Sequence, residues 1–183
     1  MTSRIEILQG DITKFTGAAI VNGANEWLLA GGGVDGAIHH AAGDELQAEC
    51  DQLGGCETGQ AKITKGYRLP VRAIIHTVGP VWQGGNKHEA ELLSACYQNS
   101  LELAAKHQLE TIAFPAISCG IYGYPVELAA PIAIHTVTNF LATNAIPKKV
   151  TFICFESAIY HAYCTAWAAY QASQKHATHS TEL

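Results

Sequence analysis

The amino-acid sequence predicts an α/β fold, a three-layer α/β/α sandwich whose central sheet is mixed but mostly parallel. Short segments rich in β-branched residues alternate with longer segments rich in Ala and Leu, the pattern of strands separated by helices. The short segments are apolar on both faces, as expected of strands that helices cover on both sides. Hydrophobic residues make up 48% of the chain and charged residues 15%, which is typical of a globular protein.

The length of 183 residues suits one ordinary domain with a sizeable core. We expect this single domain to span residues 1–173. The polar sequence QKHATHSTEL at 174–183 resembles a tail that is frayed, disordered or derived from a vector.

Six segments are expected to be strands because β-branched and apolar residues dominate them. They are residues 5–8, 18–24, 61–64, 72–79, 111–117 and 150–155. The first of these is expected to pair antiparallel at an edge of the sheet.

Four segments with apolar residues at three- and four-residue spacing are expected to be helices. They are residues 34–53, 89–107, 125–144 and 157–172. Pro131 is the one internal breaker that we identify in them. It should kink its helix or mark the first turn.

Charge and the N-terminal sequence narrow the classes of partner. The net charge is −5 and the basic residues are scattered, so nucleic acid is not an expected partner. The N-terminal sequence MTSRIEILQGD lacks a signal-peptide pattern, and no apolar segment is long enough to span a bilayer. We therefore expect a cytoplasmic protein that does not bind membranes.

The cysteines and histidines do not form a metal-binding pattern. The six cysteines include no Cys-x-x-Cys pair, and several lie within apolar segments. Among nine histidines, only His39 and His40 are adjacent, and they point to different faces of their expected helix. We expect no disulfide framework, no metal and no cofactor.

Two glycine-rich loops follow expected strands at the carboxyl edge of the sheet, where ligands bind in folds of this class. Their sequences are NGANEWLLAGGGVDG at 22–36 and ISCGIYGYP at 117–125. The glycines allow close approach of the backbone, so two loops lined by amides suit a diphosphate. The alternative is that these glycines only form tight turns.

Two common phosphate-binding motifs do not fit these loops. Gly31, Gly33 and Gly36 match G-x-G-x-x-G, but several residues separate them from the preceding strand, unlike a Rossmann fingerprint. Neither loop is followed by G-K-[ST], which argues against a nucleotide triphosphatase.

The order of five sequence blocks resembles the macrodomain family over residues 4–172. The blocks are QGDIT, VNGAN, GGGVDGAIHHAAG, HTVGP and FPAISCGIYGYP. The glycine block is most similar to the bacterial and mitochondrial subgroup that contains O-acetyl-ADP-ribose deacetylases and mono-ADP-ribosyl hydrolases.

This resemblance implies a macrodomain-like fold and a hydrolase that acts on ADP-ribose esters. The implied substrates are O-acetyl-ADP-ribose, which loses its acetyl group, and proteins that carry mono-ADP-ribose on acidic side chains. A reader module that binds ADP-ribose without cleaving it is equally compatible with the binding motifs. A regulatory protein that acts through its surface is a third alternative, for which the sequence offers no positive feature.

The resemblance also implies the roles of individual residues. It places Asp35 at the distal ribose as general base, Asn25 on the distal-ribose hydroxyls, and Asp11 on the adenine amino group. Tyr122 would cover the ribose, and Phe155 would stack on adenine. The implied catalytic residues are Asp35 and Asn25, and the implied ADP-ribose site comprises Asp11, Ile12, Asn25, Gly32, Gly33, Val34, Ser118, Cys119, Gly120, Ile121, Tyr122 and Phe155.

Each of these residues also has an ordinary structural interpretation. Asp35 could only stabilise a helix dipole, Asn25 could only cap a turn, and Phe155 could belong to the core. His39 lies one turn after Asp35 and could either bond its carboxylate or simply pack. These alternatives stay open at the level of the sequence.

Four positions depart from the usual family pattern. Gly23 stands where the family usually has alanine, and Ala30 stands where it often has glycine. His40 stands where arginine is frequent, and Cys119 where threonine is common. A Cys119 nucleophile would need a positioned histidine base, and no histidine is close to it in sequence. We therefore rank a cysteine mechanism low.

Overall fold

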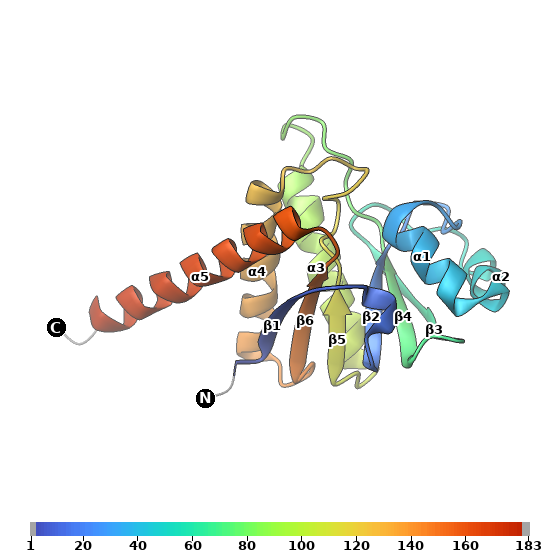
Figure 1. The fold of residues 1–183 in the computed structure, drawn as a ribbon, viewed down its shortest axis with the longest axis horizontal. Helices are drawn as coiled ribbons and strands as arrows, with labels where there is room; N and C mark the ends of the chain where they lie inside the picture. Colours follow the sequence, from blue (N-terminus) through green and yellow to red (C-terminus); the bar gives the residue numbers. More distant parts are fainter. Residues whose placement is uncertain (1–2, 181–183) are drawn as a thin grey trace.

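The computed structural model describes residues 3–180 and forms a sheet with helices on both faces (Figure 1). The predicted three-layer sandwich is confirmed. The strands are β1 (Ile5–Gln9), β2 (Gly17–Gly23), β3 (Ala61–Lys65), β4 (Val71–Thr77), β5 (Thr111–Phe114) and β6 (Lys149–Cys154). The helices are η1 (Ile12–Lys14), α1 (Gly33–Ala42), α2 (Asp44–Gln52), α3 (Glu89–Lys106), α4 (Val126–Thr143) and α5 (Ser157–Ser180).

The six strands form one sheet in the order β1-β6-β5-β2-β4-β3. Only the pairing of β3 with β4 is antiparallel. The prediction that the first strand pairs antiparallel is therefore wrong, although β1 does lie at an edge. β1 pairs in parallel with β6, a strand from the other end of the chain, and the short connection between β3 and β4 makes the antiparallel edge instead.

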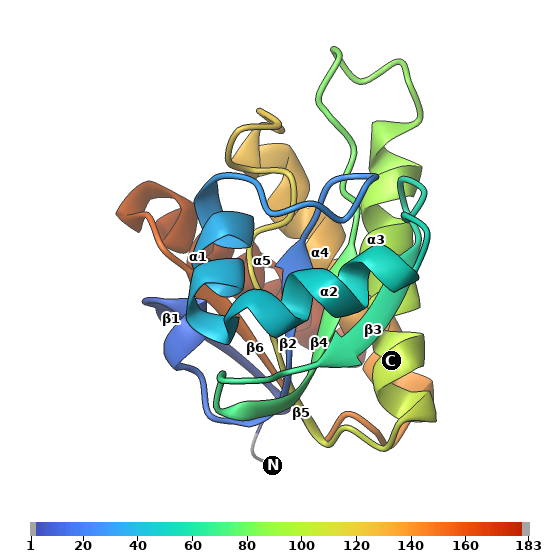
Figure 2. The same cartoon turned by 90° about the vertical axis from the view of Figure 1, so that its right-hand side faces the viewer.

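Two hydrophobic cores cover the two faces of the sheet. One lies under α3, α4 and α5 and contains Tyr97, Phe114, Phe152 and Tyr163. The other lies under α1 and α2 and contains Ile20, Ile38, Leu46 and Ile74. Figure 2 looks onto α1 and α2, which lie end to end across their face of the sheet. The strands are apolar on both faces because each face has its own core.

The segment predicted as one helix over 34–53 is two helices. Gly43 ends α1 and begins α2 with a φ of 93°, a conformation that glycine adopts at little cost. The sequence interpretation overlooked this glycine as a breaker. At α4, Pro125 is the N-cap and Pro131 lies inside the helix, so Pro131 does not mark the first turn.

The last helix is longer than predicted. α5 runs to Ser180 and extends beyond the body of the protein in Figure 1, so residues 174–180 of the expected tail are helical. Residues 181–183 of that tail lie outside the described part of the chain. Within residues 3–180, no helix combines the length and hydrophobicity that crossing a membrane requires.

The sheet order brings the two glycine-rich loops together. β2 and β5 are parallel neighbours, so the loops that follow them leave the same edge of the sheet side by side. β5 ends at Phe114, before Pro115, and the remainder of the segment predicted as strand belongs to the second loop. β1 and β6 also end at this edge, one strand further along.

Candidate functional site

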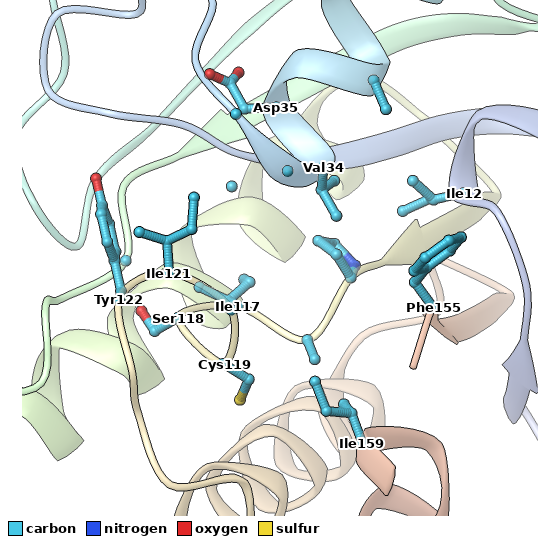
Figure 3. Close-up of a pocket in the computed structure, with 18 of the residues that line it drawn as sticks. Ile12, Val34, Asp35, Ile117, Ser118, Cys119, Ile121, Tyr122, Phe155 and Ile159 are labelled. Carbon is cyan, nitrogen blue, oxygen red and sulfur yellow. The ribbon is translucent and has the colours of Figure 1, made fainter. Parts of the chain in front are cut away.

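A cavity of about 850 Å³ opens at the carboxyl edge of the sheet (Figure 3). Its size is within the range usual for sites of small molecules and cofactors. Segments distant in sequence line it, from the ends of β1 and β6 to both glycine-rich loops. The lining includes every residue implied by the family resemblance: Asp11, Ile12, Asn25, Gly32, Gly33, Val34, Asp35, Ser118, Cys119, Gly120, Ile121, Tyr122 and Phe155.

The cavity has two ends of different character. Ile12 and Phe155 lie together at one end, and Asp35, Ile121 and Tyr122 lie toward the other (Figure 3). Phe155 is 75% exposed, so it is not part of the core. The alternative that Phe155 is a core residue at a strand end is therefore wrong, and its ring is available to a ligand.

The middle of the cavity is lined by main-chain amides. α1 begins at Gly33 without a side-chain cap, and its first helical bond is donated by the amide of Gly36. The amides that precede Gly36 in α1 therefore have no helical acceptor. In the second loop, the amides of Gly120, Ile121 and Tyr122 donate to no protein acceptor among the described residues.

These amides are the groups in the cavity that could neutralise an anion. The charged residues that line it are Asp11, Asp35 and Glu156, and within residues 3–180 no lysine or arginine does so. A bound phosphate would be held by N–H dipoles and the positive end of α1. Ile121, 83% exposed, lies over this region, since its Cδ1 atom is 3.6 Å from the position a Cβ would occupy on Gly32.

Asp35 is 6% exposed at the start of α1, and its neighbours are polar. Its Oδ1 accepts a hydrogen bond of 2.7 Å from the Asn22 amide and lies 3.4 Å from Nε2 of His39. Its Oδ2 accepts a hydrogen bond of 2.7 Å from the backbone amide of Gly31. Figure 3 shows the carboxylate directed away from the floor formed by Ser118 and Cys119.

The contacts of Asp35 determine its charge and its remaining capacity. Burial raises the pKa of its carboxyl group, but the hydrogen bonds from His39, Asn22 and Gly31 outweigh burial and hold that pKa below its ordinary value. The group is therefore a carboxylate at neutral pH. Two oxygens offer about four acceptor positions, and three are used, so one position on Oδ2 remains for a water or a hydroxyl group.

The approach of Gly31 to Asp35 depends on Gly36. A Cβ on Gly36 would lie 2.4 Å from the Gly31 carbonyl oxygen, so only glycine allows the loop to pass this close to α1. His39 lies 3.4 Å from the Asp35 carboxylate, one helical turn away, and is itself nearly buried at 8% exposure. It therefore both contacts the carboxylate and packs inside the protein.

The side chain of Asn25 is largely committed to its own loop. Its Oδ1 accepts from the amides of Trp27 and Leu29, and its Nδ2 donates to the Leu29 carbonyl. The turn-capping interpretation is thus correct for the oxygen. One N–H of the amide remains, so Asn25 can donate a single hydrogen bond into the cavity but has no oxygen left to accept one.

Asp11 combines a structural contact with a free oxygen. Its Oδ1 accepts from the amide and hydroxyl of Thr13, at 2.9 and 2.7 Å, and so begins η1. These hydrogen bonds hold the pKa of Asp11 below its ordinary value. Its Oδ2 accepts no bond from the described residues and is available to a donor on a ligand.

The Cys119 thiol is poorly suited to nucleophilic attack. Burial raises its pKa to about 12, so the thiolate is scarce at neutral pH. No histidine contacts it among the described residues. These facts agree with the low rank given to a cysteine mechanism.

Two buried polar residues of the site were missed by sequence reasoning. Asn22 and His76 are both 0% exposed and lie opposite each other on the neighbouring strands β2 and β4. A signal was present, because each is a polar residue inside an otherwise apolar strand segment. What the sequence lacked was the strand register that brings them together beside Asp35.

Comparison with known proteins agrees with this geometry. Residues 21–133 match the family described as Macro domain. The chain is 61% identical to the Macro domain-containing protein CT2219 of Chlorobaculum tepidum over 90% of this chain and 96% of that protein. It is 52% identical to the O-acetyl-ADP-ribose deacetylase of Salmonella newport, over 85% of this chain and 89% of the relative.

A solved structure with a similar fold also carries a nucleotide ligand. It is a mutant Oceanobacillus iheyensis macrodomain with ADPR, 44% identical, with a TM-score of 0.88 over 92% of this chain and 94% of that one. Sequence identity, fold and the arrangement of the glycine-rich loops therefore lead to one conclusion: the chain belongs to the Macro domain family.

Proposed function

We propose that this protein binds ADP-ribose and hydrolyses its esters, releasing acetate from O-acetyl-ADP-ribose and mono-ADP-ribose from acidic side chains of proteins. The 52% identical relative named O-acetyl-ADP-ribose deacetylase and the macrodomain solved with ADPR support this assignment. The observation that carries it is the ionised Asp35 with one unused acceptor position at the edge of a cavity whose middle is lined by amides.

The proposed binding mode follows the two ends of the cavity. Adenine lies on Phe155, with its amino group donating to Oδ2 of Asp11. The diphosphate receives hydrogen bonds from the amides of the two glycine-rich loops, because no cationic side chain of the described residues lines the cavity. The distal ribose then reaches Asn25, whose remaining N–H donates to one of its hydroxyl groups, and Tyr122 covers it.

In the proposed reaction, Oδ2 of Asp35 orients a water molecule toward the ester carbonyl carbon. The lowered pKa makes Asp35 a weak proton acceptor, so its main contribution is to position and polarise that water. Water adds to the carbonyl carbon, the ester C–O bond breaks, and the ribose oxygen takes up a proton. The products are ADP-ribose and a carboxylic acid, which releases its proton to solvent.

The alternative is a reader module that binds ADP-ribose without cleaving it. The same carboxylate supports this alternative, because Asp35 is nearly buried and three of its acceptor positions are occupied by the protein. A carboxylate in this state can be a structural anchor for the glycine-rich loop. The two functions differ in whether its last acceptor position holds a reactive water.

The Asp35→Asn variant tests the proposal. It keeps the shape of the side chain but removes its negative charge, so we expect kcat for acetate release from O-acetyl-ADP-ribose to fall at least about 100-fold. The affinity for ADP-ribose, measured by calorimetry, should change by less than about threefold, since the amides of the loops carry the diphosphate. Acetate release is followed directly by NMR.

The matched control is Asp44→Asn. Asp44 is also an acidic residue in the first turn of a helix, but it is exposed and does not line the cavity. Its variant should keep the rate of the parent protein. If the parent protein binds ADP-ribose but releases no acetate over hours, the protein is a reader; equal rates in Asp35→Asn and the parent remove Asp35 from the mechanism.

A further inference from the structure

The buried His76 is not used in the reaction proposed above, yet two successive hydrogen bonds connect it to Asp35 at one end of the cavity. It is on β4, faces α1 and α2, and is 0% exposed. A fully buried imidazole is uncommon unless its ring nitrogens are both used. Both nitrogens of His76 have partners.

The partners of His76 form a chain that ends at Asp35. Nδ1 of His76 is 3.2 Å from Nδ2 of Asn22, and the same Nδ2 donates to Oδ1 of Asp35 at 2.7 Å. Nε2 of His76 is 2.9 Å from Oγ1 of Thr64, whose hydroxyl donates to the Lys65 carbonyl. The chain thus runs from the β3 edge strand, through β4 and β2, to the first turn of α1.

The direction of each hydrogen bond in this chain follows from the groups involved. An amide nitrogen can only donate, so Nδ1 of His76 must be an acceptor without a proton. Its Nε2 then carries the proton and donates a hydrogen bond to Thr64 Oγ1. The Thr64 hydroxyl in turn donates a hydrogen bond to the Lys65 carbonyl oxygen. The imidazole is neutral in this arrangement.

The second observation concerns the carbonyl oxygen of Asn22. This Oδ1 is buried and has no hydrogen-bond partner. The orientation of the amide is therefore held only by the two acceptors of its Nδ2, which are Asp35 and His76. In the reverse orientation, Oδ1 would face the ionised Asp35 carboxylate at the same short distance, which is a repulsive contact between two acceptors.

We propose that His76 is a positioning residue: by accepting one N–H of Asn22, it aims the other at Oδ1 of Asp35 and so fixes the orientation of the carboxylate, whose Oδ2 retains one acceptor position. This inference rests on the proposed function for its effect on turnover, but not for the arrangement of hydrogen bonds. His76 touches no substrate. Thr64 supports it by holding the proton on Nε2.

The surroundings of His76 keep it neutral. Burial, and to a smaller extent the nearby His39, lowers its pKa to about 4, against the opposing charges of Asp35 and Glu49. The His39 ring lies 6.4 Å away, and the Cys50 thiol lies 4.0 Å from Nε2, with its own pKa raised to about 11 by burial. No charged group is in direct contact with the ring, so the acceptor at Nδ1 is preserved at neutral pH.

The experiment that tests this proposal first measures the tautomer of His76 in the unaltered protein, by nitrogen-15 NMR of the imidazole. The proposal expects Nδ1 without a proton and Nε2 with one between about pH 6 and 8. A proton on Nδ1 overturns the proposal, because Asn22 could not then donate to it. This measurement needs neither activity nor a variant that folds.

The second measurement follows the Asp35 carboxyl group by carbon-13 NMR in His76→Leu and His76→Asn. Leu removes both ring nitrogens, so the pKa of Asp35 should rise by on the order of one unit as the Asn22 amide loses its fixed orientation. Asn places its Oδ1 where Nδ1 of the ring was and should restore most of the shift. An Asp35 pKa that is the same in all three proteins overturns the proposal.

Turnover connects this result to the function. If the protein hydrolyses O-acetyl-ADP-ribose, His76→Leu should lower kcat about tenfold while KM and ADP-ribose affinity change less than about twofold, and His76→Asn should recover most of kcat. His40→Asn is the matched control, because His40 is exposed on α1. If the unaltered protein releases no acetate, the proposed hydrolase function fails, while the two NMR measurements still decide the role of His76.

Discussion

The two ends of the cavity place polar side chains in opposite environments. At the Phe155 end, Phe155 is 75% exposed, and Asp11 is exposed with its side chain bonded to Thr13. At the Asp35 end, Asp35, Asn22 and His76 are buried at 6%, 0% and 0% exposure and bond to one another. A group that only recognises a ligand can stand in solvent, whereas a carboxylate with a fixed orientation needs a buried scaffold.

This difference predicts how the two ends respond to change. A buried polar network contributes stability only while every member keeps its partner, since a buried group without a partner costs about 1–3 kcal/mol. Changes at the Asp35 end should therefore alter stability and turnover. Changes at the Phe155 end should alter affinity and leave the fold intact.

The largest expected effect is the loss of stability when His76 is forced to take up a proton. Its pKa in the folded protein is about 4, below the ordinary histidine value of 6.5, so below pH 6.5 the unfolded chain binds the proton more readily than the folded one. The contribution of neutral His76 to the free energy of unfolding is fully present above pH 6.5. It should decline by about 3 kcal/mol as the pH falls to 4. The lowered pKa of Asp35 acts in the same direction at still lower pH.

Urea unfolding at about pH 7 and 4.5 measures this decline. The His76→Asn variant is the comparison, because it lacks the titrating ring but keeps an acceptor toward Asn22. Its stability should depend much less on pH over this interval. If the parent and His76→Asn lose the same free energy of unfolding, the buried imidazole is not the group that titrates.

Features that depend on local sequence patterns could be predicted, whereas features that depend on distant parts of the chain could not. The strands were found because β-branched residues mark each of them, and the glycine-rich loops were found because glycine marks close backbone approach. The break at Gly43 was missed because the apolar spacing continues across it, and only the φ of 93° reveals the turn. The parallel pairing of β1 was missed because the choice of partner depends on the whole sheet.

The site residues divide in the same way. Loop residues such as Gly32 and Asn25, which line the cavity, belong to local motifs and were predicted as site residues. Asn22 and His76 were not, because their relation arises from the register of β2 against β4 and is not local in sequence. The local motif of Asn25 also concealed that its oxygen is used by the loop itself.

A smaller effect is expected at the Phe155 end. Phe155→Ala removes a surface on which adenine would stack, so ADP-ribose affinity should fall about five- to tenfold, or about 1 kcal/mol. The rate of acetate release at saturation should stay the same, and the melting temperature should hardly change, because the ring is exposed. Calorimetry gives the affinity and NMR gives the rate.

Leu128→Ala serves as the matched control for Phe155→Ala. Leu128 is also a large exposed apolar residue, at 50% exposure, but it lies on α4 and does not line the cavity. Its variant should bind ADP-ribose like the parent. A fall in kcat without a change in affinity for Phe155→Ala would show that the two ends of the cavity are not separate in function.

The smallest effect is expected for Asp11→Asn, which changes one atom that faces the ligand. Asn keeps an oxygen to accept from the Thr13 amide and hydroxyl, so η1 should still begin normally. The free carboxylate oxygen becomes an NH₂ group, which cannot accept from the amino group of adenine but can donate to the carbonyl oxygen of hypoxanthine. The affinity of Asp11→Asn for ADP-ribose should fall about threefold. Its affinity for the hypoxanthine analogue should equal or exceed that of the parent protein. A parallel loss for both ligands would mean that Asp11 supports the fold of this end and does not read the base.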